Sequence, residues 1–424
     1  MSGINRRQLL AGGVAALAAT ALPWWKRLAL AQDGPQQQRN LLLVFVGGGW
    51  DVTASIDPKP GLTTIDSPPG DVRLFGNIPV LTGSDRPAVG NFFTTWGDLC
   101  AVVNGVEVRS IAHEECTKRI LTGTNNSNRP DMGAIAGVEN GADLAVPYMI
   151  LGNTAFSGPY GGSTGRAGML GQVITLLEPE FSYSAFFGNN TRFKPTDAEA
   201  DLIKQHVLNR ANVRQSKVGE HGLNKRRMDD FIGSVERRDL LRPMLSESEE
   251  NDLTSQLEFV PQIDLALQLF KSGISRSVLI EHPGEWDTHA ENNAQQLYQH
   301  QDLYTGLNTL MERLMREGLF ESTTVVVVSE MSRTPKLNSQ NGKDHWPVTS
   351  AMVLGSQVRG GQVYGGTDVY QNSVPTNLLT GKADDSVSTT ITSAGFASGV
   401  LTLMGVDPEP YFPGVEPLRG FINS

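Results

Sequence analysis

Short apolar runs recur along the chain, and each stops at a turn or at a polar cluster. The first run extends from Leu41 to Val46 and ends at three glycines, Gly47 to Gly49. Such a run is typical of a strand buried on both faces of a parallel sheet. Five similar runs predict further strands, at residues 99–103, 148–151, 277–280, 323–328 and 351–354.

One segment between two of these runs shows helical spacing. Leu303, Leu307, Leu310 and Leu314 share one face, and Gly318 ends the pattern. A strand, a helix and a second strand in this order form a parallel crossover unit. The pattern therefore predicts an α/β fold with a mostly parallel central sheet flanked by helices.

The stretch from residue 195 to residue 257 differs from the rest in its many charges. It contains the basic cluster 225–227 and the acidic cluster 247–250, and its pattern is helical. We interpret it as a surface helical insertion or cap, with the basic cluster on a solvated face.

Residues 1–31 contain basic residues but no acidic ones. Arg6 and Arg7 precede a mild apolar run, and residues 29–31 offer a small-x-small cleavage site. This pattern predicts a twin-arginine-type signal peptide, and hence a bacterial protein that the twin-arginine machinery exports to the periplasm or beyond. The alternative, an N-terminal anchor helix, is disfavoured because the run is short and weakly hydrophobic, so we expect no stable membrane span after processing.

Composition narrows the possible functions. The chain has 424 residues, of which 39% are hydrophobic and 19% charged, as expected for a globular domain. A formal net charge of −10 argues against nucleic-acid binding, because phosphate contact needs a basic face. Two cysteines, Cys100 and Cys116, are too few for a disulfide scaffold, and their spacing leaves open whether they pair.

Histidine and carboxylate side chains collect where the predicted strands end. Ligands of open α/β sheets bind beyond the carboxyl ends of the strands, so these residues are candidates for one site. Mixed imidazole and carboxylate donors suit a divalent cation, zinc first, with manganese or calcium as alternatives. The candidate metal ligands are Asp51, Asp287, His289, Glu330, Asp344 and His345.

Each candidate also has a simpler interpretation. Asp51 follows a glycine turn and could cap a helix. Asp287 and His289 could form a hydrogen-bonded pair within a loop. Glu330 and Arg333 could form a salt bridge that only orders their loop. The metal-site hypothesis depends on these loops meeting at one sheet edge.

Three motifs resemble an exported family known as domain of unknown function 1501, a sulfatase-like branch of the alkaline phosphatase superfamily. They are TVVVVSEMSRTPKLN at 324–338, GKDHWP at 342–347 and GGQVYG at 360–365. The sequence WDTH at 286–289, the glycine turn before Asp51 and the segment 57–61 are also similar to this family. The resemblance covers nearly all of the chain after the signal peptide.

This resemblance implies a three-layer sandwich over residues 39–424, with a metal site at the strand ends. It also implies hydrolysis or transfer of phosphate and sulfate esters. Asp51 resembles the first-strand metal ligand, Asp287 and His289 an Asp/His ligand pair, and His345 a late histidine ligand assisted by Asp344.

Two positions depart from the pattern of the superfamily. Glu330 stands where an Asp-His pair is usual, and the next residue is Met331, so one usual ligand is absent. At the position of the nucleophile, upstream of Leu-Thr-Gly at 121–123, the sequence has His113. His113 could be a nucleophile, a ligand or a general acid, with Cys116 and Thr117 as alternative nucleophiles. If the protein hydrolyses such esters, Arg333 could bind a non-bridging oxygen of the ester bidentately.

Two functional hypotheses follow. The first is an exported metal-dependent hydrolase that acts on a small-molecule or polymer phosphate or sulfate ester. A formylglycine mechanism is disfavoured, because the chain has no Cys-x-Pro-x-Arg signature. The second is a non-catalytic exported protein of the cell envelope that keeps the fold and binds metal or assembles with partners.

Overall fold

The computed structural model describes residues 39–166, 196–219, 221–245 and 258–423. The predicted signal peptide lies outside these residues and stays a prediction. In the described residues, no helix is long and apolar enough to cross a membrane.

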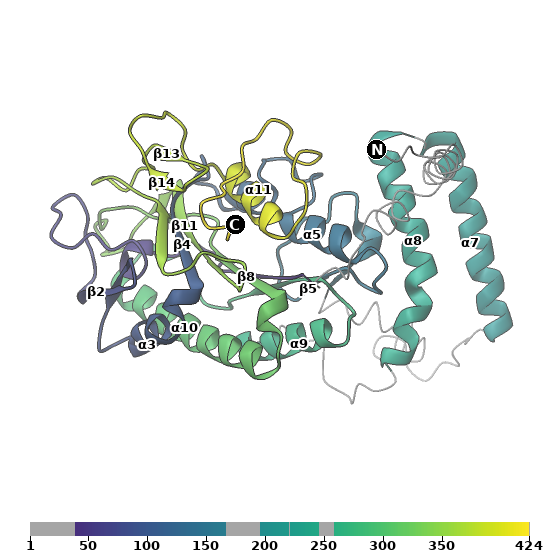
Figure 1. Ribbon diagram of the computed structural model, residues 1–424, viewed down its shortest axis with the longest axis horizontal. Helices are drawn as coiled ribbons and strands as arrows, with labels where there is room; N and C mark the ends of the chain where they lie inside the picture. The colour runs from purple at the N-terminus through teal and green to yellow at the C-terminus, as the bar shows by residue number, and fades with distance from the viewer. Residues whose placement is uncertain (1–38, 167–195, 220, 246–257, 424) are drawn as a thin grey trace, which may run out of the picture. The chain divides into compact units, whose positions relative to one another are not determined.

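Within the described residues, eight strands form the central sheet, in the order β12-β4-β11-β8-β1-β7-β5-β6. Figure 1 labels β4, β11, β8 and β5 of this sheet. Their bounds are β1 Asn40–Phe45, β4 Cys100–Glu107, β5 Tyr148–Ile150, β6 Thr164–Arg166, β7 Ser277–Glu281, β8 Thr323–Val328, β11 Val348–Leu354 and β12 Gln362–Gly365. All neighbouring strands pair in parallel except β11, which runs antiparallel to both β4 and β8. The predicted mostly parallel sheet is confirmed.

The six apolar runs of the sequence all lie in strands of this sheet. β8 has the predicted bounds, and β4 extends beyond the predicted end at residue 103 to Glu107. The polar Asn104 is accommodated there because its side-chain amide donates a hydrogen bond to the Ile56 carbonyl. β11 begins at Val348, three residues before the predicted run.

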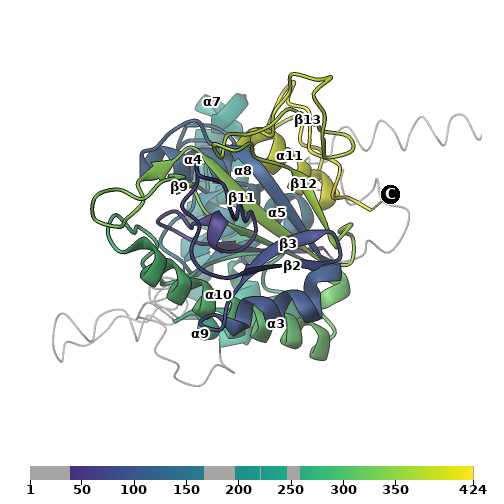
Figure 2. The same ribbon diagram turned by 90° about the vertical axis from the view of Figure 1, so that its left-hand side faces the viewer.

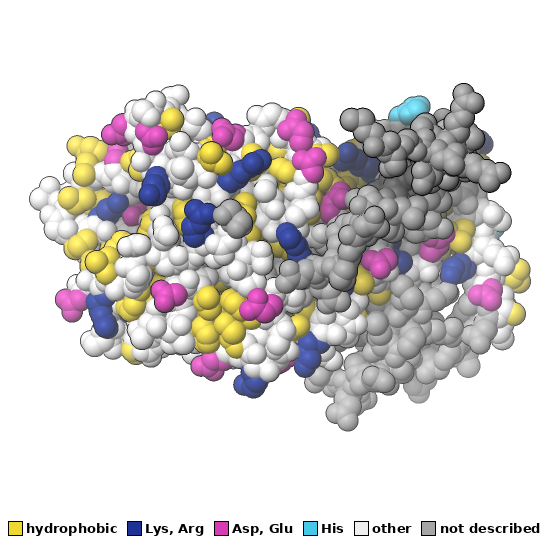
Figure 3. Space-filling view, in the orientation of Figure 1, with side chains coloured by type: hydrophobic (Ala, Val, Ile, Leu, Met, Phe, Trp, Pro, Cys, Tyr) yellow, Lys and Arg dark blue, Asp and Glu magenta, His cyan; other side chains and the backbone are white. Residues whose placement is uncertain are grey.

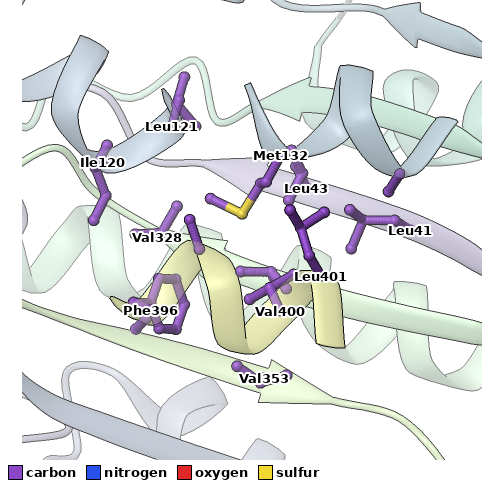
Figure 4. Close-up of a cluster of buried hydrophobic side chains, with 14 of the residues drawn as sticks. Leu41, Leu43, Ile120, Leu121, Met132, Val328, Val353, Phe396, Val400 and Leu401 are labelled. Carbon is purple, nitrogen blue, oxygen red and sulfur yellow. The ribbon is translucent and has the colours of Figure 1, made fainter. Parts of the chain in front are cut away.

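Alternate residues of β1 enter two separate cores, as a pleated strand requires. Leu41 and Leu43 lie in the first core, which the helices α4 (His113–Thr122), α5 (Met132–Gly141) and α11 (Ser393–Leu403) cover (Figure 4). Leu42 and Val44 lie in the second core, under α3 (Pro87–Trp96), α9 (Phe259–Lys271) and α10 (Asn292–Arg316). Figure 2 shows these two helix layers on either side of the sheet. The predicted three-layer arrangement is therefore confirmed.

The two cysteines belong to different cores. Cys100 packs in the second core and Cys116 in the first, and both are free thiols. The central sheet separates them, so their pairing, which the sequence left open, does not occur in this fold.

α10 is the predicted crossover helix between β7 and β8, and both strands pair with β1. Its leucines Leu303, Leu307, Leu310 and Leu314 are at most 1% exposed. Burial of each such side chain contributes about 2 kcal/mol relative to exposure, so this stripe holds α10 against the sheet.

The charge-rich stretch is helical, with α7 at Asp197–Val218 and α8 at Gly222–Leu245. Asp230 of α8 accepts hydrogen bonds from the Gly162 backbone N–H and the Ser163 hydroxyl. Lys225 forms an i,i+4 ion pair with Asp229 on this helix. The interpretation as an insertion or cap stays a prediction.

On the face seen in Figure 3, acidic and basic side chains are interspersed.

In the part of the chain that the structure describes, the strands outside the central sheet form three small two-stranded sheets. They are β2 (Asp71–Phe75) with β3 (Ile78–Thr82), β9 (Ser332–Arg333) with β10 (His345–Trp346), and β13 (Thr376–Asn377) with β14 (Lys382–Ala383). In the β9–β10 pair, His345 lies opposite Arg333, so two of the candidate loops are joined through their backbones.

Strand register brings the candidate loops to one edge. Phe45 at the end of β1 pairs with Glu281 at the end of β7 and with Val328 at the end of β8, so these three strands end level. Because β11 is antiparallel to β8, its first residues lie at this same edge. The loops after β1, β7 and β8 and the segment before β11 therefore meet.

Candidate metal centre

Three separate segments supply a compact group of potential metal ligands. His113 begins α4, Asp287 follows β7 and His345 lies in β10, and each offers one ligand atom within 4.8 Å of the others. His289 joins this group, because its Nε2 lies 3.1 Å from Asp287 Oδ1 and 3.0 Å from His345 Nε2. We refer to these four residues as the ligand group.

The His113 imidazole is oriented by a buried carboxylate. Its Nδ1 lies 2.8 Å from Glu330 Oε1, which also accepts a hydrogen bond from the Gly48 N–H, while Glu330 Oε2 accepts one from the Ser329 hydroxyl. These bonds fix Glu330, which is 2% exposed. In this arrangement Glu330 orients His113 through Oε1, and its predicted role as a metal ligand stays a prediction.

The outer ring nitrogen of His113 is available for a ligand. Its Nε2 is buried and has no hydrogen-bond partner among the described residues, with Asp287 Oδ2 at 3.3 Å. The hydrogen bond to Glu330 raises the pKa of His113 despite partial burial, with further contributions from the charges of Glu330 and Asp287. A histidine bonded to a carboxylate through one nitrogen and open at the other has the arrangement of a metal ligand.

The other two imidazoles are oriented in the same way. His289 Nδ1 lies 2.9 Å from Asp344 Oδ1, and His345 Nδ1 lies 2.7 Å from the Ile111 carbonyl oxygen. With Nδ1 of each ring engaged in this way, the two Nε2 atoms face each other at 3.0 Å, and each lies 3.1 Å from Asp287 Oδ1. This set of two nitrogens and one carboxylate oxygen has the composition of a metal site. Asp344 orients His289 here, and its predicted role as a ligand stays a prediction.

Asp287 supplies the negative charge of the group. Its Oδ1 lies 2.6 Å from Arg333 Nη2 and 3.1 Å from His345 Nε2. Partial burial raises the pKa of Asp287, but the hydrogen bonds from Arg333 and His345 and the charges of Arg333 and His113 outweigh it and bring the pKa to about 2. Asp287 is therefore ionised at neutral pH.

Arg333 is buried beside Asp287 and bonded to three backbone carbonyls. The guanidinium is 0% exposed, with Nε donating to the Gly49 carbonyl at 2.8 Å and Nη1 to the Lys343 carbonyl at 3.2 Å. Nη2 donates to Asp287 and to the Gly48 carbonyl. Arg333 thus positions Asp287 through Nη2, and its predicted catalytic role stays a prediction.

The ligand group that the described residues form does not include Asp51. Asp51 is the N-cap of the short 3-10 helix η1 (Val52–Ala54), and Lys343 Nζ lies 2.8 Å from its Oδ2. Burial raises the pKa of Asp51, but the charge and hydrogen bond of Lys343, with hydrogen bonds from Thr53 and Asn292, lower it overall. The simpler interpretation of Asp51 as a cap describes its place in the structure.

The two alternative nucleophiles are each engaged elsewhere, one in the hydrophobic core and one in a hydrogen bond to the backbone. Cys116 lies in the first core, and burial raises the pKa of its thiol to about 11. The Thr117 hydroxyl donates to the His113 carbonyl one helical turn back, at 2.7 Å. Neither side chain is placed to attack a substrate beside His113.

Sequence reasoning missed two partners of the site. The Ile111 carbonyl orients His345, and a backbone acceptor leaves no signal in residue types. Lys343 lies in the GKDHWP motif, but it is fully buried, which is uncommon for lysine. The next two residues of the motif, Asp344 and His345, are the ones that the sequence predicts as metal ligands.

Comparisons with known proteins agree with the motifs. The model of a family described as "Protein of unknown function (DUF1501)" matches residues 38–417. No curated protein matches the sequence.

Several solved structures have a distantly similar fold. The lipoteichoic acid synthase LtaP from Listeria monocytogenes is 8% identical with a TM-score of 0.36, and the match covers 92% of this chain and 77% of that one. The phosphonate monoester hydrolase of Agrobacterium radiobacter is 10% identical with a TM-score of 0.33, over 90% and 78%. The PsFucS1 sulfatase from Pseudoalteromonas sp. is 10% identical with a TM-score of 0.32, over 81% and 67%.

Proposed function

The chain belongs to the DUF1501 family of proteins of unknown function, and from its ligand group we propose that it is a metal-dependent hydrolase of phosphate or sulfate esters. The observation that carries this proposal is the convergence of His113, His289 and His345 on Asp287. Each imidazole has its Nδ1 bonded to a fixed acceptor and its Nε2 turned inward.

The donor set favours zinc. Three imidazole nitrogens and one carboxylate oxygen suit Zn²⁺, with Mn²⁺ next, whereas Ca²⁺ prefers oxygen ligands only. His113, Asp287, His289 and His345 would hold the ion. A bound divalent ion supplies Lewis acidity, which polarises an ester oxygen and acidifies water.

Water is the nucleophile that best suits this site. Cys116 and Thr117 are engaged elsewhere, and His113 is held by Glu330 as a ligand would be. The side chains of Asp287 and His289 are each 46% exposed, so solvent and an ester group can reach the ligand group. We therefore propose direct hydrolysis without a covalent enzyme intermediate.

The testing experiment combines metal analysis with activity assays. Protein exported through its own pathway is analysed for bound metal and then assayed on phosphomonoesters, phosphodiesters and sulfate esters. We expect bound zinc and a turnover that falls at least about 100-fold in Asp287→Ala and His345→Ala. His206→Ala, an exposed histidine on α7, is the matched control. Absence of bound metal, or turnover unchanged in both ligand variants, would contradict the proposal.

A second candidate is a non-catalytic metal-binding protein of the cell envelope. It is favoured by the burial of the Arg333 guanidinium, which is 0% exposed and donates four hydrogen bonds within the protein. Bound metal without turnover on all three ester classes would support it.

Export also stays part of the proposal, supported by the Arg6-Arg7 motif and the cleavage-site pattern at residues 29–31. We propose a periplasmic or secreted protein delivered by the twin-arginine machinery. Replacing both arginines with lysine should leave the protein in the cytoplasm, as cell fractionation would show. Unchanged export of that variant would contradict this route.

A further inference from the structure

Lys343 forms a buried ion pair beside the ligand group. Lys343 and Asp51 are both 0% exposed, with Lys343 Nζ 2.8 Å from Asp51 Oδ2 and 3.3 Å from Thr53 Oγ1. Burial of two charges is costly even when they are paired, so such a pair is weak evidence for a role in stability alone. Its position suggests a role in arranging the centre.

The oxygens of Asp51 are already saturated. Oδ1 accepts hydrogen bonds from the Thr53 N–H at 3.1 Å and the Thr53 hydroxyl at 2.6 Å. Oδ2 accepts from Asn292 Nδ2 at 2.9 Å and Lys343 Nζ at 2.8 Å. A carboxylate offers about four lone-pair sites, and these four donors fill them. The ammonium therefore occupies the place where another cation would meet Asp51.

The backbone of Lys343 joins the two ligand-bearing loops. Its N–H donates to the Thr288 carbonyl at 3.1 Å, and Thr288 lies directly before His289. Its carbonyl accepts from Arg333 Nη1 at 3.2 Å, and His345 follows two residues later. One residue thus connects the loop after β7, the segment before β11 and the turn after β1.

We propose that the Lys343 ammonium is the internal cation of this centre, which neutralises Asp51 and limits the protein to one divalent ion per chain. This inference rests on the proposed metal-binding function. Lys343 and Asp51 are positioning residues, because neither belongs to the ligand group itself. Their pair holds the loops of His289 and His345 against the turn that carries Asp51.

The test measures zinc stoichiometry and affinity on the full exported chain, by elemental analysis and calorimetric titration. We expect one zinc per wild-type chain. Lys343→Met should weaken zinc binding about tenfold or more, because the unpaired Asp51 charge displaces both loops. The matched control is Lys336→Met, in which an exposed lysine loses its ion pair with Asp66. Its zinc affinity should stay within about twofold of the wild type.

The double variant Asp51→Asn/Lys343→Met separates charge neutralisation from simple loss of packing. It removes both charges and keeps an oxygen acceptor for Thr53, so zinc affinity should recover to within about threefold of the wild type. If Lys343→Met fails to fold, the zinc affinity of this double variant still tests the inference. Two zinc ions per wild-type chain, unchanged affinity in Lys343→Met, or no recovery in the double variant would overturn the inference. A wild-type chain without any zinc would overturn the proposed function as well.

Discussion

Glu330 Oε1 lies 2.8 Å from His113 Nδ1, and this contact places the other nitrogen of His113 in the ligand group. A residue at the position of a nucleophile in the sequence thereby acquires the geometry of a metal ligand. The Glu330 carboxylate, predicted from the sequence as a metal ligand, contacts and orients this histidine. Predictions for the centre follow from this contact.

Glu330→Gln should weaken zinc binding about 10- to 100-fold, because the amide holds the imidazole less firmly and adds no negative charge. The pKa of His113 in the metal-free protein should fall, since the hydrogen bond to Glu330 is the main cause of its rise. Titration calorimetry and histidine NMR measure the two effects. Glu114→Gln removes an exposed carboxylate from the same helix and should change neither. An unchanged His113 pKa in Glu330→Gln would contradict this account.

Arg333→Lys should disturb the centre although it keeps the positive charge. An ammonium cannot reproduce the planar set of donors to Asp287, Gly48 and Gly49. We expect a loss of about 2 kcal/mol in the free energy of unfolding and a zinc affinity about tenfold lower. Urea denaturation and zinc titration check these values. If the variant matched the wild type in both its free energy of unfolding and its zinc affinity, Arg333 would not be the residue that positions Asp287.

Loss of the candidate nucleophiles should leave hydrolysis nearly intact. Cys116→Ala and Thr117→Val should keep turnover within about threefold of the wild type, because both side chains are engaged elsewhere. Cys116 should also react slowly with iodoacetamide, since burial raises the pKa of its thiol to about 11. A fall of two orders of magnitude in either variant would restore that residue as a nucleophile.

Hydrolysis should proceed with inversion at phosphorus. A single in-line attack by water inverts the configuration, whereas a covalent enzyme intermediate gives two inversions and net retention. A substrate with chiral, isotopically labelled phosphorus distinguishes the two. Retention would contradict direct attack by water.

His300 should make the fold less stable as the pH falls. It is fully buried, and this desolvation is the main cause that lowers its pKa from 6.5 to about 4. The folded state thus keeps His300 neutral, while the unfolded chain takes up a proton below about pH 6.5. Stability is fully present above pH 6.5 and is lost as the pH falls toward 4, by about 2 to 3 kcal/mol at pH 4.5.

The measurement compares urea denaturation of the wild type and His300→Gln between pH 7.5 and pH 4.5. Glutamine retains a donor for the Asp51 carbonyl, which His300 Nε2 contacts at 3.1 Å, but it does not titrate. The stability of the wild type should therefore fall more steeply than that of the variant. Parallel curves would rule out His300 as the source.

Local sequence patterns determined much of the fold. Continuous apolar runs gave the buried strands, because a strand covered on both faces must be apolar on both. The 3.6-residue spacing of Leu303 to Leu314 gave the crossover helix for a similarly local reason. The polar loops that follow β1, β7 and β8 could be assigned to one edge because parallel strands end together.

Only the tertiary structure decided which of these polar residues form the centre. The antiparallel direction of β11 brings His345 to the edge, and no local pattern fixes the direction of a strand. Asp51 lies outside the ligand group and accepts a hydrogen bond from Lys343, which is 292 positions away in sequence. Glu330 contacts His113, which is 217 positions away in sequence. Residue types and spacing show which side chains could bind a cation, but ion pairs and hydrogen bonds between distant segments decide which are left free to do so.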